Sequence, residues 1–257
     1  MGNGHANTVR SFRADFHIHT VLSPCAEVEM IPPFIISEAR QRRIDLIAIT
    51  DHNSTANVTA VQKAADGNGI TVIPGMELQT REEVHAICLF ETLDQLNAWQ
   101  EIVTESLPKQ SNKVDFFGEQ FIVDETGEFI RRETQLLLTS SVLSFDQACQ
   151  KVHDLGGIFF PAHVDRRAFG LIANLGFVPA DTPIDAVELS RHARISESAE
   201  KYPQVRGYPI LQNGDAHCLN DMLGAMEFWM ESPTFGEVVK ALKSQEGRKY
   251  SISENPN

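Results

Sequence analysis

The chain has 257 residues, of which 42% are hydrophobic, and this length and composition suit one large α/β domain with a sizeable core. Its 22 basic and 35 acidic residues give a formal net charge of −13, which argues against duplex nucleic acid as a partner, because phosphate contacts need a stripe of Lys and Arg. A small phosphorylated substrate is not excluded, since bound cations can reverse the sign of a site.

Short apolar segments alternate with helical patterns along most of the chain. Pro32 and Pro33 stand in the first turn of a predicted helix, where a missing N–H costs little. Strands are predicted at 15–20, 45–50, 70–78, 84–90, 158–162, 186–189 and 209–213, and helices at 31–42, 57–66, 92–105, 144–155 and 235–243. The alternation predicts a parallel sheet and favours a closed barrel over two separate sheets. In a barrel or an open sheet, functional side chains should lie at the carboxyl ends of the strands.

The alternation is interrupted at about 107–138. Segments 120–123 and 128–131 flank a turn at 124–127, which predicts a β-hairpin insertion. An insertion of this length could form a lid or a contact between copies. Residues 1–10 are expected to be a disordered lead-in to a single domain that covers residues 1–257.

The cysteines indicate a reducing compartment. Cys25, Cys88, Cys149 and Cys218 are dispersed, without a C-x-x-C pair, and a chain of this length needs no disulfides. No apolar segment approaches the roughly 20 residues of a membrane span. We therefore expect a cytoplasmic protein without a membrane partner; the sequence does not determine its oligomeric state.

Histidines and carboxylates gather at the predicted strand ends. His17 and His19 form a His-x-His pair, whose alternate side chains share one face of a strand. The other positions are Asp51, His52, Glu77, His85, His163, Asp215 and His217. His85 is the exception, because it lies near the start of its strand, and we expect a local bend to bring it to the others.

This set predicts a metal centre. Imidazole and carboxylate are ligands for zinc, iron and manganese. Bringing several of these side chains together without a cation would cost desolvation free energy. A carboxylate such as Glu77 could bridge two ions about 3.5–4 Å apart. A lone histidine is more often structural, and we interpret His153, near a helix end, as structural. His5 falls in the lead-in, and the role of His192 is left undecided.

Five motifs in order resemble the polymerase and histidinol phosphatase (PHP) family: Asp15–Thr20, Thr50–Asn53, Pro74–Glu77, Pro161–His163 and Gly214–His217. The resemblance implies a distorted seven-stranded β/α, TIM-like barrel with two or three divalent metal ions at its mouth. It assigns His17, His19, Glu77 and Asp215 to one ion, Glu77, His85 and His163 to a second, and His52 and His217 to a third.

The chain departs from the family at the third ion. Cys25 stands about where many members have a His or Asp, and it either coordinates the ion as a thiolate or packs beside a weaker site. Cys218 is interpreted as structural.

The mechanism expected from this set is attack of a metal-activated water on phosphorus. His217 or Asp51 could move a proton to the leaving oxygen, although we favour Asp51 as a residue that orients a ligand histidine. Arg166 and Arg191 follow predicted strands and are expected to bind phosphate oxygens.

The preferred function is hydrolysis of a phosphate ester of a small phosphorylated metabolite or nucleotide. The alternatives are an exonuclease-like phosphodiesterase on short single-stranded nucleic acid, or a metal-binding module without turnover. An amidohydrolase is disfavoured, because Val84–Ile87 lacks the lysine that commonly bridges the metals in that group.

Overall fold

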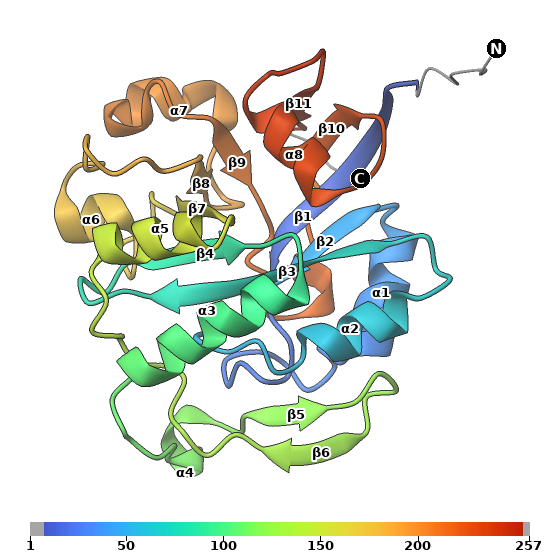
Figure 1. Cartoon of the computed structure of the whole chain (residues 1–257), viewed down its shortest axis with the longest axis vertical. Helices are drawn as coiled ribbons and strands as arrows, with labels where there is room; N and C mark the ends of the chain where they lie inside the picture. The colour runs from blue at the N-terminus through green and yellow to red at the C-terminus, as the bar shows by residue number, and fades with distance from the viewer. Residues whose placement is uncertain (1–7, 254–257) are drawn as a thin grey trace.

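A computed structural model describes residues 8–253 of the chain. Its main element is a mixed seven-stranded sheet in the order β11-β10-β1-β2-β3-β4-β7. Figure 1 shows this sheet curling around the centre of the molecule, with helices around it. Its strands are β1 (Arg10–Ile18), β2 (Leu46–Ile49), β3 (Thr71–Gln79), β4 (His85–Leu89), β7 (Ile158–Pro161), β10 (Met226–Met230) and β11 (Lys249–Ile252).

The α/β class is confirmed, but a closed seven-stranded barrel is not, because the sheet is open. Two predicted strands, β8 (Val187–Leu189) and β9 (Ile210–Gln212), pair in a separate parallel sheet. Backbone hydrogen bonds join this small sheet to the segments beside it: the N–H of Val164 donates to the carbonyl of Glu188, and the N–H of Ala216 donates to that of His17. Strand ends of both sheets therefore meet in one place.

The predicted parallel order fails at β4. β1, β2 and β3 are parallel neighbours, whereas β4 runs antiparallel to both β3 and β7. The connection between β3 and β4 has only residues 80–84, too few for the crossover that a parallel pair requires. Because β4 is reversed, its first residue, His85, pairs with Gln79 at the end of β3. The local bend that we predicted for His85 is wrong; strand direction brings it to the site.

The first strand begins earlier than the predicted residue 15. Arg10–Ala14 pair antiparallel with β10, so that residue 10 belongs to the sheet and not to a disordered lead-in. The rest of the predicted lead-in, with His5, falls mostly on residues 1–7, which lie outside the described part of the chain.

Helices pack against both faces of the sheet. They are α1 (Pro32–Gln41), α2 (Val58–Ala65), α3 (Leu93–Ser106), α5 (Phe145–Asp154), α6 (Leu171–Leu175), α7 (Ile195–Lys201) and α8 (Phe235–Leu242), with short 3₁₀ turns at Pro203–Val205 and Leu219–Asp221. Capping boxes begin α3 at Thr92 and α5 at Ser144, and prolines occupy the first turn of α1, as predicted. No helix within residues 8–253 is long and apolar enough to cross a membrane.

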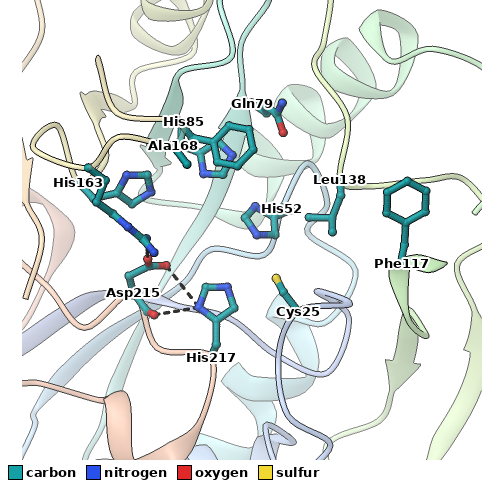
Figure 2. A pocket seen from close by; sticks show the side chains of 12 residues that line it. Cys25, His52, Gln79, His85, Phe117, Leu138, His163, Ala168, Asp215 and His217 are labelled. Atoms are coloured by element: carbon teal, nitrogen blue, oxygen red, sulfur yellow. Dashed lines mark hydrogen bonds and ion pairs between the residues drawn. The ribbon is translucent and has the colours of Figure 1, made fainter. Parts of the chain in front are cut away.

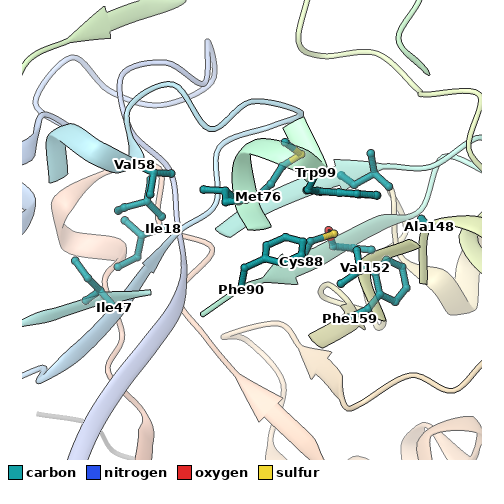
Figure 3. Packing of buried hydrophobic residues seen from close by; sticks show 14 of the residues in the cluster. Ile18, Ile47, Val58, Met76, Cys88, Phe90, Trp99, Ala148, Val152 and Phe159 are labelled. Atoms are coloured by element: carbon teal, nitrogen blue, oxygen red, sulfur yellow. The ribbon is translucent and has the colours of Figure 1, made fainter. Parts of the chain in front are cut away.

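The sheet separates two apolar cores. In β2, Ile47 and Ile49 pack with α1, α2 and α3, while Leu46 and Ala48 face the opposite cluster with α8. This division follows the two-residue period of a strand, and the uniformly apolar sequence of β2 reflects burial on both faces. Figure 3 shows the first cluster, in which Trp99 of α3 lies close to Met76 and Cys88 of the sheet.

The insertion contains the predicted hairpin, β5 (Phe121–Val123) and β6 (Phe129–Arg132), preceded by the short helix α4 (Val114–Phe117). The side chain of Asn57 ties the hairpin to the body, because its Nδ2 donates to the carbonyl of Phe121 and its Oδ1 accepts from the N–H of Val123, each at 3.0 Å. The hairpin lies below the ends of β1 and β2 in Figure 1.

Arg248 and Glu237, near the C-terminal end of the chain, form an ion pair whose contribution to the free energy of unfolding should depend on pH. Arg248 Nε donates to Glu237 Oε2 at 2.8 Å, and this bond lowers the pKa of Glu237 to about 2. Since the folded pKa lies below the unfolded value, the stabilisation is complete above about pH 4.5 and is lost as the pH falls toward 2. We expect Glu237→Gln to lower the free energy of unfolding by about 1–3 kcal/mol at pH 7 and by much less at pH 3. Denaturant unfolding at both pH values measures this, and an equal loss at both would contradict it.

Candidate metal centre

The strand ends enclose a pocket of about 410 Å³. Figure 2 shows the imidazoles of His52, His85, His163 and His217 directed toward one another in this pocket. The lining residues are Cys25, His52, Gln79, His85, Phe117, Leu138, His163, Arg166, Ala168, Phe169, Asp215 and His217. They come from β3, β4, the segments after β1, β2, β7 and β9, and the insertion.

Glu77 lies at the centre of the cluster, fully buried at the end of β3. Its carboxylate oxygens lie 2.7 Å from Nδ1 of His52 and 2.9 Å from Nδ1 of His85. Nε2 atoms of three further histidines lie 3.2–3.5 Å away, namely those of His17, His163 and His19. One carboxylate therefore contacts five imidazoles, which is the arrangement a bridging ligand needs.

Asp215 closes the cluster from the segment after β9. Its Oδ1 lies 3.3 Å from Nε2 of His17 and 3.4 Å from Nε2 of His19, while Nδ1 of His217 donates to its carbonyl at 2.9 Å. Asp215 (φ 48°) and His163 (φ 30°) both have left-handed backbone. Such conformations are costly for non-glycine residues, and they occur where the surrounding structure holds a functional group in place.

Several buried side-chain atoms of the cluster have no hydrogen-bond partner among the described residues. Within residues 8–253, no hydrogen bond reaches Nε2 of His17, His19 or His85, Oε2 of Glu77, or Nδ1 of His163. Unsatisfied buried polar groups are expensive, so a cluster of them indicates a missing ligand. Three overlapping groups each bring their ligand atoms within 4.8 Å of one another: His17, His19 and Glu77; His52, Glu77 and His85; His19, His52 and His217. This donor set fits divalent cations.

The electrostatics agree with cation binding. Burial alone raises the pKa of Glu77, but the imidazoles of His85, His17 and His52 hold it well below its usual value. Burial lowers the pKa of His17, yet Glu188, Glu77 and Asp215 together raise it well above the usual value. The centre thus carries negative charge that recruits a proton, and a metal ion can take that proton's place.

Glu188 of β8 is a functional residue that the sequence analysis missed. It is buried and accepts a hydrogen bond from Nδ1 of His17 at 3.0 Å, which directs Nε2 of that ring toward Glu77 and Asp215. Nδ2 of Asn213 and the N–H of His163 also donate to Glu188, at 2.8 and 3.0 Å. A carboxylate inside an apolar strand needs partners, and this rule could have singled out Glu188.

We expect Glu188→Gln to weaken metal binding by about 10- to 100-fold, because the neutral amide no longer fixes the tautomer and orientation of His17. Competition with a metal-sensitive dye measures the affinity. Glu200, exposed to solvent in α7, allows a matched surface control, Glu200→Gln. An unchanged affinity in Glu188→Gln would remove its orienting role.

Asp51 stands behind the cluster and does not line the pocket. Its carboxylate accepts from Thr20 N–H and Oγ1 and from Ser23 Oγ, each at 2.7 Å, and Ser23 Oγ lies 3.0 Å from Nδ1 of His19. These contacts orient His19 through Ser23. They argue against a direct catalytic role for Asp51, whereas His217 lines the pocket.

Cys25 lies at the exposed rim of the pocket. Burial of the thiol raises its pKa, but the neighbouring imidazoles of His52 and His217 outweigh this effect and lower the pKa to about 6. Figure 2 shows its sulfur directed toward those two rings. The sulfur thus lies beside the group of His19, His52 and His217, which does not itself include Cys25, and both predicted roles of the thiol stay predictions.

The remaining candidates divide between the pocket and the surface. Arg166 lines the pocket and forms an ion pair with Asp215, while Arg191 pairs with Asp221 in an adjoining hollow of about 120 Å³. His192 lines that hollow too. His153 donates to Asp185 at 2.7 Å, away from the pocket, and so has a structural contact.

The fold and this site define a class of metal-dependent hydrolase. Residues 15–173 match the family model of the PHP domain, and the protein belongs to that family. The predicted family is therefore confirmed.

Two protein sequences are similar to the chain. YqxK, an uncharacterized protein of Bacillus subtilis, is 25% identical over 276 residues, which cover 94% of this chain and 64% of YqxK. The 5′-3′ exoribonuclease Rnm of Salmonella typhimurium is 32% identical over 89 residues, which cover 34% of this chain and 29% of Rnm. The chain thus spans less than two thirds of either relative.

Among solved structures, the lesion-specific endonuclease PfuEndoQ of Pyrococcus furiosus has the same fold, with a TM-score of 0.71 and 22% identity. The similarity covers 94% of this chain and 58% of the endonuclease. Endonuclease Q has also been solved with a 27-mer duplex that carries an abasic lesion at the active site.

These findings correct the predicted partners. We predicted a small phosphorylated substrate and argued against duplex nucleic acid, and the endonuclease Q complexes contradict that exclusion. The net charge of −13 describes the whole chain, whereas binding depends on charge at the mouth. There, Arg166 and Arg167 are exposed, and the cations of the centre would add further positive charge.

Proposed function

We propose that the protein is a metal-dependent phosphodiesterase that cleaves nucleic-acid strands. The observation that carries this proposal is a pair of adjoining hollows that share Arg166, Asp215 and His217. The larger one contains the metal-ligand cluster, and the smaller one offers Arg191, His192 and Ser190. A strand has a second phosphate close to the one being cleaved, and the smaller hollow offers Arg191, whose present partner is Asp221, to bind it.

Each residue has a distinct role in this proposal. His17, His19, Glu77, Asp215, His85, His163, His52, His217 and Cys25 hold two or three ions, which we expect to be zinc, iron or manganese. When bound, these ions supply the Lewis acid that activates water. Arg166 binds a non-bridging oxygen of the scissile phosphate, and Arg191 binds the neighbouring phosphate. With two ions bound, His217 is not a ligand and passes a proton to the leaving oxygen; with a third ion bound it would be a ligand instead.

The mode of cleavage has two candidates. Internal cleavage is favoured by the fold shared with endonuclease Q over 94% of the chain. Exonucleolytic cleavage of single strands is favoured by the 32% identity with the exoribonuclease Rnm over 89 residues. The domain extent of 1–257 and the cytoplasmic location stay predictions.

The test is a cleavage assay with metal-reconstituted protein. Substrates are an intact duplex, the same duplex with an abasic site, single-stranded DNA, 5′-phosphorylated RNA and a simple phosphomonoester. We expect cleavage of at least one nucleic acid, its loss after chelation, and its loss in His17→Ala. Product lengths distinguish internal from terminal cleavage. Activity that survives both treatments would remove the metallohydrolase assignment, and metal binding without any cleavage would indicate a binding module.

A further inference from the structure

One part of the catalytic pocket has no role in holding metal or phosphate. Its outer wall is apolar and consists of Phe117 and Leu138 from the insertion and Phe169 from the segment after β7. Figure 2 shows Phe117 and Leu138 on the side of the pocket opposite His163. A phosphate and its cations need no such surface, so this wall points to an apolar portion of the substrate.

Phe169 is held against the cluster at some cost. Its backbone is left-handed (φ 58°), which is unfavourable for a bulky residue. Its carbonyl accepts from the N–H of His85 at 3.0 Å, and its ring stacks on that of His85 with centroids 4.4 Å apart and planes within 6°. The ring remains 39% exposed. The fold thus fixes an exposed aromatic ring directly above a metal-ligand histidine.

Phe117 is fixed from the other side. It ends α4, where Gly118 (φ 96°) turns the chain so closely against Pro24 that a Cβ on the glycine would lie 2.8 Å from the Pro24 carbonyl oxygen. The ring packs edge to face with that of Phe116 at 4.7 Å, and Phe116 itself is 80% exposed. Phe117 therefore lines the pocket without entering the core, and Phe116, which contacts it, stays in solvent.

We propose that Phe117 and Phe169 form a base-binding subsite that stacks on an unpaired nucleobase next to the scissile phosphate. Stacking suits any base, because every base has a π face. The pocket volume of about 410 Å³ lies within the range of small-ligand sites and leaves room for a base beside the ions. The amide of Gln79, whose Nε2 donates to Ser140 at 2.9 Å, adds one fixed polar group to this subsite.

This inference rests on the proposed function and specifies it, because a base must leave the helical stack to enter the subsite. It assigns a function to the insertion, which supplies one of the two rings. The lid and the contact between copies that we considered for the insertion stay predictions.

Binding of two ligands that differ only in the base tests the subsite without requiring cleavage. Calorimetry with the metal-loaded full chain compares thymidine 5′-monophosphate with 2-deoxyribose 5-phosphate. We expect the wild-type protein to prefer the nucleotide. In Phe117→Ala and Phe169→Ala this preference should fall by about 5- to 100-fold. Phe117→Leu should also lose it, while Phe117→Tyr should keep it, which separates stacking from apolar packing.

Phe34→Ala is the matched control, because Phe34 is 48% exposed on α1 and does not line the pocket. Its preference should equal that of the wild-type protein. Equal wild-type affinity for the two ligands would overturn the subsite, and so would an unchanged preference in a folded Phe117→Ala protein. Both outcomes are independent of whether the protein cleaves nucleic acid, which the cleavage assay decides.

Discussion

Glu77→Gln is expected to reduce metal-dependent phosphodiesterase activity by at least about 1,000-fold, the largest effect of any single substitution in the chain. A metal ion contributes several kcal/mol of transition-state stabilisation, and each 1.36 kcal/mol corresponds to about tenfold in rate. Glu77 contacts five imidazoles and belongs to two of the three groups that could hold a cation. A neutral amide of the same shape removes the charge around which these groups are built.

The measurement combines metal analysis by mass spectrometry with the cleavage assay. Glutamine is nearly isosteric with glutamate, so circular dichroism should show an intact fold. Glu91→Gln provides the control, because Glu91 is exposed beyond the end of β4. Wild-type metal content and activity in a folded Glu77→Gln protein would show that Glu77 is not a bridging ligand.

Removal of metal is expected to lower the melting temperature by about 5–11 °C. A cation that binds only the folded state, present at 100 times its Kd, raises the free energy of unfolding by about 2.7 kcal/mol. The melting temperature of a domain of this size changes by about 2–4 °C for each kcal/mol of unfolding free energy. The effect should be destabilising because the buried atoms of His17, His19, His85 and Glu77 lose their partner.

Thermal unfolding before and after chelation measures this shift, and re-addition of zinc or manganese should reverse it. The Glu77→Gln protein supplies the internal control, since its melting temperature should respond less to the chelator: of the three groups, only that of His19, His52 and His217 keeps all its ligands. A wild-type protein that melts unchanged after verified metal removal would show that the cluster is satisfied without a cation.

Our argument against duplex nucleic acid relied on the net charge of the whole chain. A sum over the whole chain treats every acidic residue alike, although Glu77, Glu188 and Asp215 serve the centre itself. A metal centre converts such carboxylates from a barrier into a site for anions. Local composition at the mouth is therefore more informative than the total of −13.

Most local structure could be predicted from the sequence. Capping boxes at Thr92 and Ser144 and the prolines of α1 act over a single turn, so they specify helices without tertiary information. The same is true of the hairpin in the insertion. The ligand types at the strand ends predicted a metal centre for a similar reason, because strands of one sheet bring their ends together.

Several features depended on contacts between distant segments. The direction of β4 decided how His85 reaches Glu77, and the open sheet replaced the expected closed barrel. Glu188 became an orienting residue only because folding brings its carboxylate within hydrogen-bond distance of His17, 171 positions away in sequence. Phe117 became part of the pocket only because the insertion docks against the segment after β1.

Chain-local signals in the sequence thus determined most of the elements, though not β10, β11, α6 or α7, together with the metal-ligand types and the family of this protein. The tertiary structure alone decided strand direction, the partners that orient each ligand, and the aromatic wall of the pocket. The physical reason is range: capping, turn formation and strand periodicity act between neighbouring residues, whereas hydrogen bonds to buried histidines and the stacking of rings require segments whose proximity arises only from folding.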